Sequence, residues 1–576
     1  MNTVNIIAVF LLLTVTLVTA AIHNVGWWKH TVFYQIYPRS FMDSDNNGVG
    51  DLKGITSKLQ HFKDSGVGAI WLSPINRSPM ADFGYDISDF KDVDETFGSL
   101  EDLKVLLKTA KSLGLKVVLD LVPNHTSDQH YWFKMSVDRV GKYANYYMWH
   151  DGKKNESGSL IPPNNWNSVF NGSGWTYHST RKQFYYHQFL PQQPDLNYTN
   201  PDVQEEMKEI IRYWLDMGMD GFRIDAVPHL FENNITQDEP PSNTPGAKPL
   251  EHIFLDHTLT KDQPQTYELI KSWREFVDQY ADQNNQDEKV LMTEAYTSWE
   301  KTLQYYKYGS NVPFNFKFIT DANGNSNITV FKNIIDRWVQ NVPKGSVANW
   351  VMGNHDRTRI ATRYGVRADQ MTMLAMMLPG VAVTYYGEEI GMEDYGTFIT
   401  YDIRDGCRTP FQWDNSSNAG FSNANKTWLP VNPNYPELNL EKEKADAISH
   451  YNLYKGLTSL RSSSNALKDG ELSTAILNND VLTVVRKASN DTATLLINFS
   501  NDKNVTVDLS NFVGNSETKI KLSNVDSKLK SGTQVKTSSV VVPAKASMIL
   551  VSSGTTLARF SVASVLLMPF IALFKS

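Results

Sequence analysis

The chain has 576 residues, and its 62 acidic and 55 basic residues give a net charge of −7. That charge argues against a nucleic-acid-binding protein, because a phosphate backbone demands basic patches. The length allows several domains with a core that needs no disulfides, and the single cysteine, Cys407, excludes an intrachain disulfide and a cysteine-rich metal site. We expect Cys407 to be buried as a small apolar side chain.

The first 20 residues have the pattern of a signal peptide. Residues 6–18 are almost wholly apolar, which is short for a membrane span and typical of a signal-peptide core. Small residues at 18–20 fit a cleavage site, so we expect a secreted chain that begins near Ala21; an uncleaved signal anchor is the alternative. Secretion makes Asn-x-Ser/Thr sites meaningful. The candidates for glycosylation are Asn155, Asn171, Asn327, Asn425, Asn490 and Asn504.

A loop rich in Asp and Asn follows the first predicted strand, at residues 43–51. It offers oxygen ligands at the spacing of an EF-hand loop, and hard oxygen ligands suit Ca²⁺. The alternative is an Asx-rich turn without an ion. We expect a structural calcium ion here, held by the side chains of Asp43, Asp45, Asn47 and Asp51 and the carbonyl of Val49.

Short apolar runs recur along the chain, and the stretches between them suit helices, for example residues 100–113 and 202–217. Alternating strands and helices indicate parallel strands, and eight such units predict an α/β fold closed into a (β/α)8 TIM barrel. The expected strands are residues 32–37, 69–72, 116–122, 221–226, 290–294, 312–316, 350–353 and 381–386.

Two segments depart from the barrel rhythm. The stretch after the third strand is rich in Asn, Gly, Trp, Tyr and Pro and lacks clear helical periodicity, so we expect an inserted subdomain B near the functional face. Later β-branched runs separated by turn residues predict a C-terminal antiparallel β-domain. The predicted organisation is barrel at 21–125, subdomain B at 126–201, barrel at 202–471 and β-domain at 472–552.

The last residues, 553–576, follow the order of a glycosylphosphatidylinositol (GPI) anchor signal. A small-residue cluster at 552–554 precedes a polar spacer and an apolar tail at 560–574. We expect lipid attachment at Ser552, removal of the tail, and a protein on the extracellular face of the plasma membrane. A short C-terminal membrane helix is the alternative.

Polar residues gather where the predicted barrel strands end, and barrel enzymes place their catalytic groups on this face. Asp225 and Glu294 close the fourth and fifth strands, and Asp356 follows the seventh. Three carboxylates around a neutral pocket suit glycoside cleavage by a nucleophile and an acid/base. Arg223 lies two residues before Asp225 on the same side of its strand and would keep it ionised. This favours Asp225 as nucleophile and Glu294 as acid/base.

These motifs resemble the α-amylase superfamily, in its α-glucosidase (maltase) branch. The signature stretches are residues 120–125, 221–226, 293–296 and 353–356, with a further branch motif at 193–197. The resemblance implies the same roles for Asp225 and Glu294, and makes Asp356 the carboxylate that holds and distorts the sugar. The residues it implies for binding glucose at the cleavage site are His125, His355 and Arg223. Asn124 lies in the first stretch, so we expect it to be buried and without glycan.

The resemblance also implies how the substrate is chosen. Asp86 matches the residue that binds the terminal glucose, and Arg404 matches the arginine paired with it. Such a pair would close a blind pocket that admits one glucose, so the enzyme would trim chain ends. Ala226, after the nucleophile, is similar to members that prefer α-1,4 links, so maltose and short α-1,4-oligosaccharides are expected, with sucrose as a further substrate. Related maltases carry calcium in the loop at 43–51.

The signal, the anchor and the motifs together resemble insect gut maltases, mosquito midgut ones in particular. This implies the apical face of the gut epithelium, and a bacterial binary toxin as a partner, since members of that group are its receptors. Two alternatives stay open: a non-enzymatic relative such as a transporter heavy chain, and a transglycosylating enzyme such as a sucrose isomerase. The sequence also leaves open whether the protein is a monomer or a dimer.

Overall fold

The computed structural model describes residues 21–396, 402–513 and 517–553. The predicted signal peptide, 1–20, lies outside these residues. So does the predicted anchor signal, apart from Ser553, which ends the last strand.

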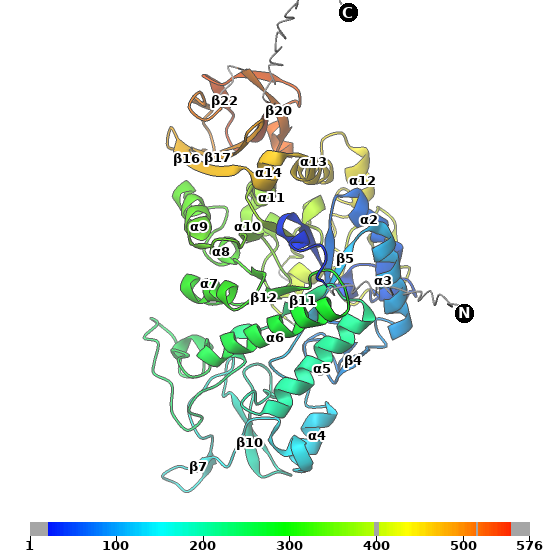
Figure 1. Ribbon diagram of the computed structural model, residues 1–576, viewed down its shortest axis with the longest axis vertical. Helices are drawn as coiled ribbons and strands as arrows, with labels where there is room; N and C mark the ends of the chain where they lie inside the picture. Colours follow the sequence, from blue (N-terminus) through cyan, green and yellow to red (C-terminus); the bar gives the residue numbers. More distant parts are fainter. Residues whose placement is uncertain (1–20, 397–401, 514–516, 554–576) are drawn as a thin grey trace, which may run out of the picture.

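Eight parallel strands form the central sheet, in the order β13-β12-β11-β5-β2-β1-β15-β14 (Figure 1). Each predicted apolar run overlaps one of these strands, so the predicted TIM barrel is confirmed. Their bounds are β1 Val32–Ile36, β2 Ala69–Leu72, β5 Lys116–Leu121, β11 Gly221–Ile224, β12 Val290–Thr293, β13 Val312–Pro313, β14 Asn349–Val351 and β15 Val381–Tyr385.

A side chain links the two end strands of this sheet. Asn349, the first residue of β14, donates from Nδ2 to the Pro313 carbonyl of β13 at 2.6 Å. Its Oδ1 accepts the Asn315 N–H at 2.8 Å. The amide satisfies backbone groups where β13 is only two residues long, and so closes the barrel.

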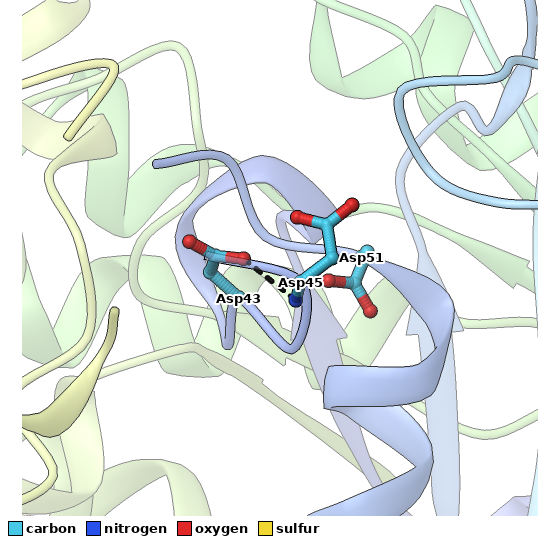
Figure 2. A group of neighbouring side chains, drawn as sticks. All are labelled: Asp43, Asp45 and Asp51. Carbon is cyan, nitrogen blue, oxygen red and sulfur yellow. Dashed lines mark hydrogen bonds between the residues drawn. The ribbon is translucent and has the colours of Figure 1, made fainter. Parts of the chain in front are cut away.

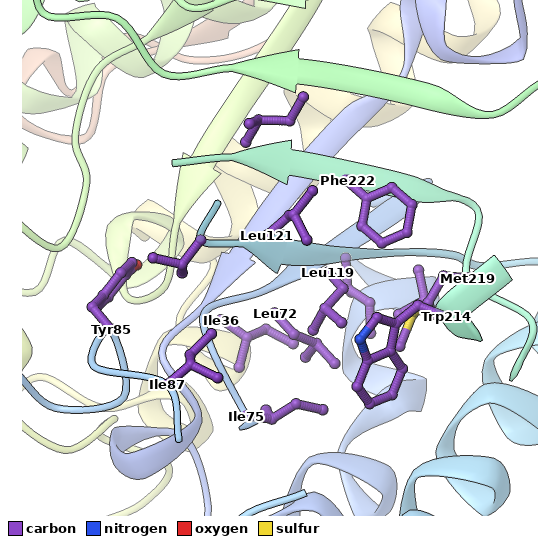
Figure 3. Packing of buried hydrophobic residues seen from close by; sticks show 14 of the residues in the cluster. Ile36, Leu72, Ile75, Tyr85, Ile87, Leu119, Leu121, Trp214, Met219 and Phe222 are labelled. Atoms are coloured by element: carbon purple, nitrogen blue, oxygen red, sulfur yellow. The ribbon is translucent and has the colours of Figure 1, made fainter. Parts of the chain in front are cut away.

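Alternate residues of each strand face opposite sides, as strand geometry requires. Phe33, Trp71 and Val118 belong to the cluster inside the barrel. Ile36, Leu72, Leu119 and Phe222 pack outward against the surrounding helices (Figure 3). Since the register pairs Arg223 with Asp120, two polar residues of neighbouring strands lie side by side near the strand ends.

Helices surround the barrel, and both helices named from the sequence are present. The predicted helix at 100–113 is α3, Leu100–Leu113, which has a capping box between Ser99 and Asp102. The one predicted at 202–217 is α5, Pro201–Met217, with Gly218 at positive φ ending it. The other long helices are α6 Pro264–Gln283, α7 Trp299–Lys307, α9 Ile328–Asn341, α11 Ala368–Met377 and α13 His450–Ser463.

The segment after β5 contains a short helix that the sequence did not indicate, α4 Tyr131–Val137. It also contains a small antiparallel sheet of β6 Trp149–His150, β9 Trp175–His178 and β10 Gln183–Tyr186. Trp166 and Trp175 belong to a separate aromatic cluster there. The segment returns to the barrel through a bridge between His125 and Asp195, which brings residues 193–195 beside the end of β5.

The C-terminal region forms a six-stranded antiparallel sheet, β16-β17-β18-β23-β20-β21, at the opposite end of the molecule from α4 and β10 (Figure 1). It begins at Glu471, one residue before the predicted boundary, and Ser552 lies inside β23, paired with Thr492. Among the described residues no helix is long and apolar enough to span a bilayer. The strands are β16 Glu471–Leu477, β17 Val481–Ala488, β18 Asp491–Asn498, β20 Glu517–Ser523, β21 Gln534–Lys536 and β23 Ser547–Ser553.

Candidate active site

One buried guanidinium links three carboxylates at the ends of neighbouring strands. Arg223, on β11, is 1% exposed. Its Nη1 lies 2.8 Å from Asp120 Oδ1 and 2.5 Å from Asp225 Oδ1, and its Nη2 lies 2.9 Å from Glu294 Oε1. Because a single positive charge faces three acids, at least one of them is favoured in its protonated form.

Asp225 and Glu294, the two acids that the sequence predicted to be catalytic, differ in pKa. Burial raises the pKa of Asp225 to about 6, against the opposing charge of Arg223. Burial raises the pKa of Glu294 further, to about 8, and its neighbours Asp225 and Asp356 add to the shift. Near neutral pH, Asp225 is therefore ionised while Glu294 holds a proton. That separation is what a nucleophile and a general acid require.

The third predicted carboxylate has a more cationic environment. Burial alone would raise the pKa of Asp356, but the positive charges of Arg408 and Arg404 hold it well below its usual range. Arg408 Nη2 lies 3.1 Å from Asp356 Oδ1, and Arg408 Nε donates to the His355 carbonyl at 2.7 Å. Asp356 is thus a permanently charged acceptor at the same face of the barrel.

The predicted pairing of Asp86 with Arg404 is wrong. Arg404 Nη2 lies 2.7 Å from Asp82 Oδ1, and the same guanidinium contacts Asp402 and Asp356. Asp86 is fully buried, and its oxygens accept hydrogen bonds from Ser78 Oγ and from the N–H groups of the turn before it, at residues 81 and 82. Because the oxygens of Asp86 accept these hydrogen bonds within the turn, Asp82 is the residue of this loop that pairs with Arg404.

The two predicted histidines are buried and uncharged. Burial lowers the pKa of His125 to about 4 and that of His355 to about 3. His125 Nε2 lies 3.0 Å from the Tyr85 carbonyl, and the His355 ring stacks on the Tyr85 ring at 5.2 Å between centroids. Neutral imidazoles can each donate one hydrogen bond and accept one, which suits recognition of sugar hydroxyls.

Sequence reasoning passed over three residues at this face: Asp82, Tyr85 and Gln193. Tyr85 Oη donates to Asp120 Oδ2 at 3.1 Å, and Gln193 Nε2 donates to Asp82 Oδ2 at 3.1 Å. Gln193 lies inside the branch motif at 193–197 and Tyr85 directly precedes Asp86, so closeness to these family positions was the available signal. Their orientation toward the site depends on loop geometry.

The loop after β1 brings three of the five predicted calcium ligands together. Asp43, Asp45 and Asp51 each have an oxygen within 4.8 Å of the others (Figure 2). Burial raises the pKa of Asp45, and the charges of Asp43 and Asp51 add to it. Asn47 Oδ1 accepts the Val49 N–H at 2.8 Å, so in this conformation Asn47 serves the turn. Three adjacent carboxylates without an ion pair among the described residues fit a hard divalent cation.

The remaining predicted positions differ in their exposure to solvent. All six glycosylation candidates have exposed side chains. Asn124, expected to be bare, is 1% exposed and donates to Asp195 Oδ2 at 3.0 Å. Cys407 is buried as expected, and burial raises the pKa of its thiol to about 12.

A parallel barrel with paired carboxylates of separated pKa at its C-terminal edge defines a glycoside-cleaving barrel enzyme. The chain belongs to the α-amylase family, because the model of the alpha amylase catalytic domain matches residues 35–470. The predicted superfamily is thereby confirmed.

Individual relatives carry different names. Maltase 1 of Drosophila virilis is 48% identical over 514 residues, covering 85% of this chain and 81% of that protein. The amino acid transporter heavy chain SLC3A1 of Homo sapiens is 40% identical over 485 residues, covering 81% and 70%. The structure of XgtA, an alpha-glucosyl transfer enzyme, matches with a TM-score of 0.78 at 31% identity, covering 91% and 99% of the two chains. Because these relatives are named as a hydrolase, a transporter subunit and a transfer enzyme, the site residues are needed to choose among these activities for this chain.

Proposed function

We propose that this chain is a retaining α-glucosidase that releases terminal glucose from maltose and short α-1,4-oligosaccharides, with sucrose as a further substrate. The observation that carries the proposal is the Arg223 cluster, which joins Asp225 and Glu294 on neighbouring strands while burial separates their pKa values. The similarity to Maltase 1 supports the choice of substrate.

The proposed reaction has two displacements. Glu294 donates its proton to the glycosidic oxygen while the Asp225 carboxylate attacks the anomeric carbon, so the leaving sugar departs and a covalent glucosyl-enzyme forms. Glu294, now ionised, takes a proton from water, and the resulting oxygen attacks the same carbon and releases Asp225. Two inversions leave the α-configuration unchanged. Asp356, His125 and His355 would hold the glucose ring through its hydroxyls.

The surroundings support cleavage at chain ends. The pair of Arg404 with Asp82 joins the loop after β2 to the segment at 402–408 beside Asp356, which would close the pocket behind one glucose.

The deciding experiment follows maltose hydrolysis by proton NMR. The protein would end at Ser553, and Asp225→Ala would be compared with Glu441→Ala, which removes an exposed carboxylate of the α12 helix, Leu440–Ala445. We expect α-glucose to appear before mutarotation, a dead Asp225 variant and an unaffected control. Initial release of β-glucose, or an active Asp225→Ala variant, would overturn the mechanism.

Glucosyl transfer is the second candidate, favoured by the similarity to XgtA. The same carboxylates would act, and a second sugar would replace water as the acceptor in the second step. Product analysis with sucrose separates the two. Hydrolysis yields glucose and fructose, whereas transfer yields an isomer of sucrose or a longer sugar.

We also propose that Ca²⁺ stabilises the loop at 43–51 through the carboxylates of Asp43, Asp45 and Asp51. The ion would be structural. The resemblance to related maltases supports the ion, together with the donor set of the loop.

For location, we propose a secreted protein held on the outer cell surface by a GPI anchor near Ser552. Treatment of expressing cells with phosphatidylinositol-specific lipase should release it, and retention on the cells would reject the anchor. Binding of a bacterial binary toxin is a hypothesis that rests on the resemblance alone. A dimer is one of the oligomeric states that the sequence leaves open, and no described residue is assigned to either role.

A further inference from the structure

Gln35 is a fully buried polar residue of β1 that none of the proposed roles uses. Its side chain is 0% exposed. Nε2 lies 2.8 Å from Nδ1 of His355 and 3.2 Å from Oγ of Ser73. Since Gln35 and His355 are 320 residues apart, the contact exists only because β1 and the segment after β14 meet at the same end of the barrel.

The His355 ring has a defined place and only one proton to offer. It lies between the rings of Tyr37 and Tyr85, at centroid distances of 5.9 and 5.2 Å. Its Nε2 lies 3.4 Å from Asp356 Oδ2. Burial lowers its pKa to about 3, so the ring is neutral. The charged groups that face it are Asp356, Arg408, Arg223 and Arg404.

We propose that Gln35 is a positioning residue, which holds the neutral His355 in the tautomer with its proton on Nε2. An ionised carboxylate beside Nε2 requires an N–H there, so Nδ1 must be the acceptor. The amide NH₂ of Gln35 supplies one N–H to Nδ1 and the other to Ser73 Oγ. His355 then presents a fixed donor toward Asp356 and the space of the bound glucose; that use of the donor rests on the proposed function.

The opposite orientation of the Gln35 amide is less favourable. In the present orientation Oε1 is buried without a partner. Turning the amide would satisfy Oε1 from an Nδ1–H, but would bury the NH₂ group without an acceptor. It would also leave the bare lone pair of His355 Nε2 against the Asp356 carboxylate, where two acceptors repel. Leaving Oε1 of Gln35 without a partner therefore costs less free energy than the alternative. In the alternative, the NH₂ group of Gln35 has no acceptor and His355 Nε2 repels the Asp356 carboxylate.

Two variants test the proposal. Gln35→Met keeps the side-chain length but removes the donor, and Gln35→Glu offers an acceptor that favours the opposite tautomer or a charged ring. On maltose we expect kcat/KM to fall about tenfold for Met and about a hundredfold for Glu, mainly through kcat. Gln370→Met is the matched control. That residue is also 0% exposed and donates to the Lys545 carbonyl at 2.7 Å, far from the site, so kcat and KM should stay unchanged.

A spectroscopic readout separates positioning from folding. In ¹⁵N-histidine-labelled protein, the signals of His355 are identified by their loss in His355→Gln. We expect Nδ1 without a proton and Nε2 with one in the wild type, and a changed pattern in Gln35→Glu. A proton on wild-type Nδ1 would overturn the proposal even if neither variant folds. So would wild-type kcat/KM in both variants while Asp225→Ala is dead. If the wild type cleaves no α-glucoside, the proposed function fails, and the tautomer is still decided by the spectrum.

Discussion

Arg223 shows how one residue can influence which neighbouring carboxyl groups are protonated. It is buried, it contacts Asp120, Asp225 and Glu294, and it cannot give up its proton. The carboxylate nearest to it keeps its charge most easily, and Glu294, whose pKa is raised to about 8, keeps its proton. Charge placement within a few ångströms thus assigns different roles to chemically similar groups.

The pH dependence of kcat/KM follows from these two acids. Asp225 must be ionised to attack, so activity should fall as pH drops through its raised pKa of about 6. Glu294 must be protonated to assist departure of the leaving group, so activity should fall again as pH rises through about 8. We expect a bell-shaped profile. In Glu294→Gln the alkaline limb should disappear along with most activity toward maltose. A wild-type kcat/KM that does not fall as pH rises through about 8 would contradict the assignment of Glu294 as the general acid.

At the scale of elements, loops at strand ends decide which of several similar residues reach the site. The loop after β2 contains both Asp82 and Asp86, and both are buried. Asp86 accepts hydrogen bonds from the turn of this loop, whereas Asp82 forms the ion pair with Arg404.

Paired substitutions in this loop should separate binding from stability. Asp82→Asn removes the charge that faces Arg404, so we expect KM for maltose to rise and kcat/KM to fall at least tenfold. Asp86→Asn weakens acceptors inside the turn, so the free energy of unfolding should fall by about 1–3 kcal/mol, while kcat/KM of the folded protein stays near wild type. Denaturant melts and steady-state kinetics measure both. The reverse pattern would return Asp86 to the binding role.

The loop at 43–51 should respond to calcium. It contacts a distant segment, since the Asp43 N–H donates to the Phe421 carbonyl at 3.0 Å and the Trp428 N–H donates to the Gly48 carbonyl at 2.9 Å. A bound ion stabilises the folded state by about 2.7 kcal/mol when its free concentration is 100 times Kd. We expect chelation to lower Tm and Asp45→Ala to abolish that effect, whereas exposed Asp64→Ala keeps it. Metal analysis of native protein without Ca²⁺ would reject the site.

At the scale of the whole molecule, the barrel and the C-terminal sheet share buried contacts. Asp369, on α11, accepts from His450 Nδ1 at 2.6 Å and from the Val525 N–H, beyond β20, at 3.0 Å. Leu453 and Tyr454 on α13 belong to the same hydrophobic cluster as Leu482 and Leu495 of the sheet. The two parts are therefore expected to unfold together.

This junction predicts a pH dependence of stability. Burial opposes protonation of His450, but its hydrogen bond with Asp369 and the charge of Asp369 raise its pKa from 6.5 to about 9. A raised pKa contributes stability that is complete below 6.5 and is lost as pH rises from about 6.5 to 9. We expect Tm to fall over that range in the wild type and to change less in His450→Gln. Equal slopes in the two proteins would show that His450 is not the titrating group.

Much of this molecule was predictable from local patterns. The strands of the barrel are buried on both faces, so they appear as apolar runs such as β2, Ala69–Leu72. Asp225 and Glu294 were predictable as site residues because they directly follow β11 and β12, and Asp356 because it comes a few residues after β14. The short helix α4 was not, because the segment that contains it has no sustained helical period.

By itself, the sequence determined the barrel, its C-terminal sheet and the carboxylates at the strand ends, because these depend on periodicity and on adjacency along the chain. Only the tertiary structure decided that Asp82 meets Arg404, that Asn349 closes the barrel and that Gln35 faces His355. Each of these contacts joins residues tens to hundreds of positions apart. Their partners are selected by the direction of a turn or the register of a strand, which no local pattern encodes.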